Sequence, residues 1–250
     1  MNTHAIRNEQ ETEQHSLLKA AAFHLIPGAV TFLFIFFISP ILHKAGLTIA
    51  LSINLETILW LAPAMLGILI YQARRQTGTF SLKGIMPYRQ KLPLRHYLIL
   101  VPVVLGWAVL IFWLMEPVSR VLLEHVFSFY PDWFDASTDD MSRYSHGMLV
   151  ATWVSDFILI GLLAPVVEEL YFRGYLLPRL GRYRGWGLLI NVVLFVVYHF
   201  FSPWMIITRL IAIFPMYFVV WRTKNIYIGM VAHVLLNLIS ALSLYSLYFG

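Results

Sequence analysis

The chain has 250 residues, of which 59% are hydrophobic and 12% are charged, and its formal net charge is +5. A soluble domain carries about a quarter charged residues, so half of the usual surface charge is absent. The chain holds no cysteine, which excludes disulfides, thiolate catalysis and Cys-ligated metal centres. Several stretches of roughly 20 residues are almost free of charge, the length that a helix needs to cross a bilayer. We therefore predict an all-α polytopic transmembrane bundle embedded in lipid, and no nucleic-acid partner.

Seven transmembrane spans are predicted in chain order, after a polar segment 1–19 that we interpret as a cytosolic tail rather than a cleaved leader. The predicted spans cover residues 20–42, 56–73, 97–116, 150–178, 186–202, 204–221 and 225–248. We interpret residues 20–149 as accessory transmembrane helices with one basic and one acidic loop. Residues 150–250 are interpreted as the core that carries the chemistry.

The charges of the loops predict the orientation in the membrane. Residues 74–96 hold only basic charges, and 179–184 and 222–224 are also basic, whereas 117–149 is mainly acidic. Cytoplasmic loops of membrane proteins are enriched in Lys and Arg. The alternation of these loops over seven spans therefore predicts a cytosolic amino terminus and an outer carboxyl terminus. We expect an integral protein of a bacterial cytoplasmic membrane.

Ionisable residues gather in the last four predicted spans, whereas the other spans have very few. Charge within the hydrocarbon costs about 2.5–3.5 kcal/mol per residue, so such residues are candidates for function. They are Asp156, Glu168, Glu169, Arg173, His199, Arg209 and His233, with Asn237 one turn beyond His233. We interpret Asp156 and Arg209 as structural, either as a buried pair or as contacts of Glu169 and Arg173.

Helical spacing sorts these groups. Glu169 and Arg173 are four residues apart and can neutralise one another on one helix face. Glu168 points about 100° away from Glu169, so its partners must come from another helix. Glu168 lies roughly 16 Å from Arg179 and His233 roughly 13 Å from Lys224 along their helices, so these side chains can meet near the middle of the bilayer.

A carboxylate and two imidazoles in a desolvated cavity suit one reaction class. Glu168 and His199 can activate a water molecule by accepting its proton. His233 and Asn237, which share a helix face, can donate hydrogen bonds to the oxygen that becomes negative when an amide is attacked. The predicted reaction is hydrolysis of a peptide bond, and it needs no serine or cysteine nucleophile.

Three short motifs carry a resemblance to a known family. Residues 168–173 fit the signature EExxxR, residues 195–199 fit FxxxH, and residues 233–237 fit HxxxN. In this order and on separate spans they resemble the CPBP family of CAAX proteases and bacteriocin-processing (Abi) enzymes, over about residues 150–240. The resemblance implies a CPBP-like catalytic core that cleaves a membrane-associated protein or peptide.

The resemblance also implies a role for each motif residue. Glu168 and His199 would activate water, and His233 and Asn237 would form the oxyanion site. Glu169, Arg173 and Phe195 match the supporting positions. We favour a metal-free glutamate mechanism, because the usual HExxH helix of zinc proteases is absent. Zinc stays open as the alternative cofactor, with Glu168, His199 and His233 as its ligands.

Two other functions remain open at the level of sequence. The first is a non-catalytic immunity or scaffold protein of the same fold, whose usual mark is the loss of a motif residue; no motif residue is lost here. The second is a transporter or proton relay, which also uses carboxylates and His within the membrane. Transporters often show inverted repeats and paired broken helices, and the sequence shows neither.

Overall fold

The computed structural model describes residues 12–249, and within them it contains helices and turns but no strand. The predicted all-α fold is thereby confirmed. Residues 1–11, which form most of the predicted tail 1–19, lie outside the described residues. In chain order the α-helices are α2 (Leu17–Phe37), α3 (Ser39–Lys44), α4 (Ile49–Glu56), α5 (Ala62–Thr77), α6 (Leu94–Leu114), α7 (Glu116–Val121), α8 (His146–Ser155), α9 (Ala164–Glu168), α10 (Gly185–Tyr198), α11 (Ile206–Thr223), α12 (Ile226–Ser243) and α13 (Tyr245–Phe249).

Short π-helical segments join several of these helices into longer rods. The segment η1 (Thr57–Leu61) continues α4 into α5, and η7 (Asp156–Leu163) and η8 (Glu169–Leu176) lie on either side of α9. A 3-10 segment, η9 (Leu177–Tyr183), ends the same rod. Single π turns inside α-helices are frequent at functional sites. Here two of them enclose the motif residue Glu168.

Within residues 12–249, six helical stretches are long and apolar enough to cross a membrane. They are Leu17–Lys44, Ile49–Thr77, Leu94–Leu114, His146–Tyr183, Pro203–Thr223 and Ile226–Phe249. Helix α10 is a shorter apolar helix of 14 residues, about 21 Å at 1.5 Å per residue. The prediction of about seven spans agrees with these six helices and α10. Large apolar side chains such as Val103 and Trp113 are 63% and 72% exposed, as a surface against lipid requires.

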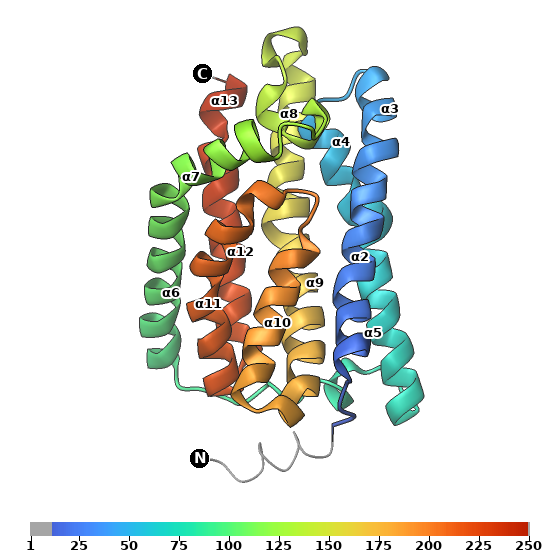
Figure 1. Cartoon of the computed structure of the whole chain (residues 1–250), viewed down its shortest axis with the longest axis vertical. Helices are drawn as coiled ribbons and strands as arrows, with labels where there is room; N and C mark the ends of the chain where they lie inside the picture. Colours follow the sequence, from blue (N-terminus) through green and yellow to red (C-terminus); the bar gives the residue numbers. More distant parts are fainter. Residues whose placement is uncertain (1–11, 250) are drawn as a thin grey trace.

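The charged loops separate to the two ends of the bundle. In Figure 1 the chain between α5 and α6 and the turn before α10 lie at the lower end, and α7 and the start of α8 lie at the upper end. The basic segments contact one another, because the backbone N–H of Gln90 donates to Lys224 O and Arg179 donates to Ile85 O. The sequence grouping of basic and acidic loops is thus reproduced in space.

The turn between α10 and α11 lies within the bundle, beneath the segment that follows α6 (Figure 1). Helix α10 ends at Tyr198, four residues before the predicted end of that span at 202. The Tyr130 hydroxyl donates to the carbonyl of Phe200 at 2.8 Å, so a side chain from the upper loop satisfies this turn. Tyr130 also packs edge-on against Phe134 and Trp204. The aromatic side chains of the upper loop therefore cover the α10–α11 turn.

Helices α2 and α10 approach closely at Gly28. A Cβ atom at this position would lie 2.2 Å from the carbonyl oxygen of Tyr198 and 2.9 Å from its ring. Because the nearest atom belongs to the backbone, a methyl group at this position can be accommodated only if α2 and α10 move apart. We expect Gly28→Ala to lower the free energy of unfolding by about 1–3 kcal/mol, measured as a shift of the thermal unfolding midpoint in detergent.

Gly67 in α5 provides the matched control for Gly28. A Cβ atom there meets nothing within 4 Å. Alanine is a better helix former than glycine by about 1 kcal/mol in a helix interior, so Gly67→Ala should leave the midpoint unchanged or raise it. Equal losses of stability in the two variants would contradict the proposed contact.

The described part of the predicted tail packs on the lower end of the bundle. His15 is 1% exposed, and its backbone N–H donates to Arg179 O at 2.8 Å. Burial, followed by the charges of Lys19 and Arg179, lowers the pKa of the His15 imidazole to about 4. The undocked segment binds a proton near pH 6.5. Docking is therefore fully stable above about pH 6.5 and weakens as the pH falls toward 4.

We accordingly expect faster amide hydrogen exchange in residues 12–16 at pH 5.0 than at pH 7.5, after correction for intrinsic rates. His15→Phe keeps an aromatic ring beside Phe23 and Tyr175 and removes the titrating group. This variant should show the same corrected exchange at both pH values. If it retains the pH dependence of the wild type, another group is responsible.

Candidate active site

A cavity of about 270 Å³ lies in the middle of the bundle and receives side chains from both halves of the chain. Its walls come from α2, α4, η1, α6, η7, α9, α10, α11 and α12 and from the turn after α10. Apolar residues form much of the lining. The polar and charged residues of the lining are Thr31, Glu56, Thr57, Glu168, Tyr198, His199, Arg209, His233 and Asn237.

Glu168 ends α9 and is 6% exposed, with partners only from other helices. Its Oε1 atom accepts a long hydrogen bond of 3.4 Å from the Tyr198 hydroxyl and lies 3.9 Å from Nε2 of His199. Its Oε2 atom lies 3.9 Å from Nε2 of His233. The expectation that Glu168 meets both histidines across helices is thus reproduced. Tyr198 was not predicted as a neighbour, because the FxxxH signature treats its position as variable.

The position of His199 at the end of α10 fixes which ring nitrogen faces the cavity. Its Nδ1 atom lies 2.9 Å from the carbonyl oxygen of Phe195, one turn earlier. A carbonyl can only accept, so Nδ1 donates and a neutral ring presents the lone pair of Nε2 to Glu168. The Phe195 ring also packs edge-on against His199, with centroids 4.8 Å apart. The spacing of Phe195 and His199 thereby orients the imidazole.

His233 is oriented by the predicted pair of Glu169 and Arg173. Arg173 donates to Oε1 of Glu169, and both side chains are fully buried. The same oxygen lies 2.8 Å from Nδ1 of His233, which must donate to a carboxylate. The Arg173 guanidinium also lies 3.9 Å from the centroid of the Tyr217 ring. Sequence spacing predicted the ion pair but not that it holds His233.

Asn237 lines the cavity but also makes a bond that the sequence did not indicate. Its Nδ2 atom donates to the carbonyl of Ile160 at 2.9 Å. In the π register of η7, where Ala164 N–H donates to Leu159 O, the next donor in line would be residue 165. That residue is Pro165, which has no N–H. Asn237 therefore satisfies a carbonyl that the proline leaves without a backbone partner, and it retains one N–H of its amide.

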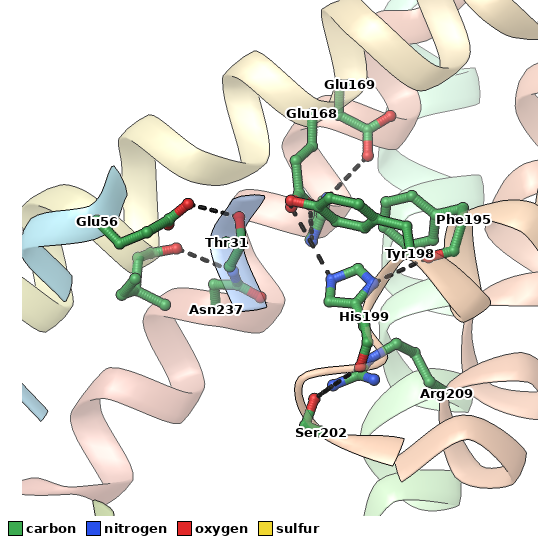
Figure 2. Close-up of polar contacts among 12 residues, drawn as sticks. Thr31, Glu56, Glu168, Glu169, Phe195, Tyr198, His199, Ser202, Arg209 and Asn237 are labelled. Carbon is green, nitrogen blue, oxygen red and sulfur yellow. Dashed lines mark hydrogen bonds and ion pairs between the residues drawn. The ribbon is translucent and has the colours of Figure 1, made fainter. Parts of the chain in front are cut away.

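A second buried carboxyl group, Glu56, enters the cavity from the first half of the chain (Figure 2). It is 4% exposed, and its Oε1 atom accepts a hydrogen bond of 2.5 Å from the Thr31 hydroxyl. The predicted span began at residue 56, which placed this acid at the membrane boundary. Helix α4 begins at Ile49 instead, because the Thr48 side chain caps it. That cap was the sequence signal for the earlier start.

The suggested partners of Asp156 and Arg209 are wrong. Asp156 accepts hydrogen bonds from Asn54 at 2.6 Å and from Tyr248 at 2.9 Å. Arg209 lines the cavity, and its Nη2 atom donates to the Ser202 hydroxyl at 3.2 Å. Polar side chains from loops and from α4 and α13 supply these bonds, and helical spacing within the last four spans could not reveal them.

Among residues 12–249, no group of three or more His, Asp or Glu side chains has the arrangement of a metal site. The carboxylate of Glu168 nevertheless has both imidazole Nε2 atoms at 3.9 Å.

Comparison with known proteins identifies the segment that carries this site. Residues 150–239 match the family described as Rce1-like, type II CAAX prenyl endopeptidase Rce1-like. No curated protein and no solved structure matches the chain. The matched segment contains all three motifs, whereas Thr31 and Glu56 lie outside it. Residues 150–239 of this integral membrane protein are therefore similar to the Rce1-like type II CAAX prenyl endopeptidase family, which is the CPBP family indicated by the motifs.

Proposed function

We propose that this chain is an intramembrane endopeptidase that hydrolyses a peptide bond of a membrane-associated protein or peptide. The observation that carries the proposal is the position of Glu168, whose two carboxylate oxygens each face an imidazole Nε2 atom at 3.9 Å inside a cavity. That distance is too long for a direct hydrogen bond, and it leaves room for a small polar molecule between these groups. Membership of the matched segment in a family of CAAX endopeptidases supports the same activity.

In the proposed reaction, Glu168 and His199 hold a water molecule and take one of its protons. The remaining hydroxide attacks the carbonyl carbon of the scissile peptide bond. The negative oxygen that forms accepts hydrogen bonds from Nε2–H of His233, which Glu169 holds in place through Nδ1, and from the free N–H of Asn237. The proton held by Glu168 and His199 then passes to the leaving nitrogen as the C–N bond breaks. The products are a carboxylate and an amine.

The mechanism that we favour uses no metal ion. Glu168 would act as the base, a role that contributes about 10²–10⁴-fold in rate when such a group is well placed. In the alternative, zinc would be held by Glu168, His199 and His233 and would supply an activated water. The two mechanisms require the same residues, so substitutions alone do not separate them.

Cleavage of a synthetic single-span peptide in detergent tests the proposal. The reaction is run in H₂¹⁸O, with and without a zinc chelator. We expect two fragments, one of which carries a single ¹⁸O in its new carboxylate, and no effect of the chelator. Loss of cleavage with the chelator and recovery with zinc would establish the metal alternative. Absence of cleavage across a broad peptide panel would reject the proposed activity and favour the non-catalytic immunity or scaffold function.

We further propose that the protein lies in a bacterial cytoplasmic membrane with its amino terminus in the cytosol. The positive charges of 74–96 support this orientation. The chain has no cysteine, so a single introduced cysteine reports one position. In spheroplasts, an impermeant maleimide should label Ser137→Cys directly and Lys83→Cys only after permeabilisation. The reverse pattern would overturn the orientation.

A further inference from the structure

Among residues 12–249, Arg209 forms no direct ion pair with a carboxylate, although it lies inside the bundle; Glu168 of the same cavity acts on its charge only at longer range. Its Nη2 atom donates to the neutral Ser202 hydroxyl at 3.2 Å, and its Nη1 atom is buried without a hydrogen-bond partner. Guanidinium carries five N–H donors and stays charged in proteins. A cation in this position is costly unless an anion compensates it.

The two buried arginines, Arg173 and Arg179, are compensated in ways that the partly buried Arg209 is not. Arg173 forms an ion pair with Glu169 and stacks on Tyr217. Arg179 donates to two backbone carbonyls and to Gln76, and its guanidinium lies 3.7 Å from the centroid of the Tyr175 ring. Both also have guanidinium nitrogens without a hydrogen-bond partner. Neither, however, lines the cavity that contains Glu168.

Arg209 lies on the same cavity wall as the reacting groups. It comes from α11, and Figure 2 shows its side chain beside His199, directed to Ser202. The second carboxyl group in the cavity, that of Glu56, already accepts a hydrogen bond from the Thr31 hydroxyl. A peptide bound with its scissile bond at Glu168 would therefore meet one incompletely satisfied cation close to His199.

We infer that Arg209 binds a carboxylate of the peptide substrate and so determines which peptides are cleaved. The inference rests on the proposed function, because it concerns a ligand of the same cavity. A planar guanidinium matches a carboxylate with two parallel hydrogen bonds, which gives both affinity and geometry. In a peptide this carboxylate is either the chain terminus or an Asp or Glu side chain near the cleaved bond.

The test compares four forms of one synthetic peptide, which has an apolar span followed by a short tail with one Asp. The terminus is either a free acid or an amide, and the Asp is either kept or replaced by Asn. Values of kcat and KM are measured for the wild type, Arg209→Gln, Arg209→Lys and the control Arg222→Gln. Arg222 is an exposed arginine in the last turn of the same helix, away from the cavity.

The wild type should prefer one carboxylate by about 10- to 100-fold in kcat/KM, mainly through KM. Arg209→Gln should remove that preference, so that its kcat/KM values for all four forms are similar. Arg209→Lys should show an intermediate preference. Lysine keeps the positive charge but cannot make two parallel hydrogen bonds to a carboxylate. Arg222→Gln should behave as the wild type. If the wild type loses its preference when the terminus is an amide, the recognised carboxylate is the chain terminus. If it loses the preference when Asp is replaced by Asn, the recognised carboxylate is the side chain.

Two results would overturn the inference while the proposed activity stands. The wild type could cleave all four forms equally, or Arg209→Gln could slow all four by the same factor, as a purely structural or electrostatic role requires. Thermal unfolding of Arg209→Gln in detergent separates misfolding from these effects, and Arg209→Lys provides the comparison if the glutamine variant does not fold. Failure of the wild type to cleave any form would instead reject the proposed activity, and this inference with it.

Discussion

Replacement of Glu168 by glutamine should lower the rate of peptide cleavage by about 10³–10⁴-fold, near the upper end of what one general base contributes. Glutamine has the shape of glutamate and can still accept a hydrogen bond from the Tyr198 hydroxyl. It cannot take a proton from water. The loss should therefore appear in kcat, whereas peptide binding, measured with the same variant, should be retained.

The stability of Glu168→Gln separates this effect from misfolding. Glu168 makes no hydrogen bond to either histidine at 3.9 Å, so its removal leaves no tight partner unpaired. We expect the thermal midpoint to change little. Glu116→Gln is the matched control, because Glu116 is an exposed acid that pairs with Arg120 near the upper end. A variant at 168 that keeps more than a tenth of wild-type activity would rule out Glu168 as the base.

Breaking the pair of Glu169 and Arg173 should produce the largest loss of stability. Both side chains are fully buried. Removal of one partner from such a pair leaves an uncompensated charge and costs about 3–5 kcal/mol. We expect Glu169→Leu to lower the free energy of unfolding by this amount, or to prevent accumulation of the folded protein in the membrane.

The double variant Glu169→Leu/Arg173→Met should recover most of that stability, because an apolar pair of similar size often replaces a buried ion pair without loss. It should not recover activity. His233 then lacks the acceptor that holds its Nδ1 atom at 2.8 Å, and a displacement of about 1 Å at a reacting group can cost about 10²-fold in rate. Stability is measured by thermal unfolding in detergent and activity by initial rates of peptide cleavage.

Recovery of both properties in the double variant would show that Glu169 only neutralises Arg173. The single variant Arg173→Met adds a further check, since it leaves Glu169 free to hold His233. If Glu169 acts on His233, Arg173→Met should lose more stability than activity.

The motif positions could be predicted because they obey short-range helical geometry. The four-residue spacing of Glu169 and Arg173 places them on one helix face wherever the helix packs. The same spacing joins Phe195 to His199. These regularities, together with the cost of charge in lipid, were sufficient to indicate that Glu168 would meet His199 and His233.

The contributions of the first half of the chain could not be predicted in this way. Glu56 depends on Thr31, which lies 25 residues away on another helix. Asn237 bonds to Ile160 because a π segment precedes Pro165, and the backbone register of a π turn leaves little trace in the apolar pattern. Contacts of this kind follow from how helices are packed side by side, which spacing within one span does not encode.

The length of α10 was also overestimated for a physical reason. Some of residues 199–202 are apolar or aromatic. A span assigned from hydropathy therefore extends through them. The Tyr130 hydroxyl caps the turn from a distant loop, so a chain reversal within the bundle is satisfied without water. Such a cap can be predicted only from knowledge of the tertiary structure.

The mixed origin of the cavity has a consequence for selective inhibition. Thr31 and Glu56 come from helices outside the segment 150–239 that matches the Rce1-like family. A compound that binds only Glu168 and the two histidines would engage groups set by the family motifs. A compound that extends across the cavity to donate a hydrogen bond to Glu56 would distinguish this protein from any relative with a different amino-terminal half.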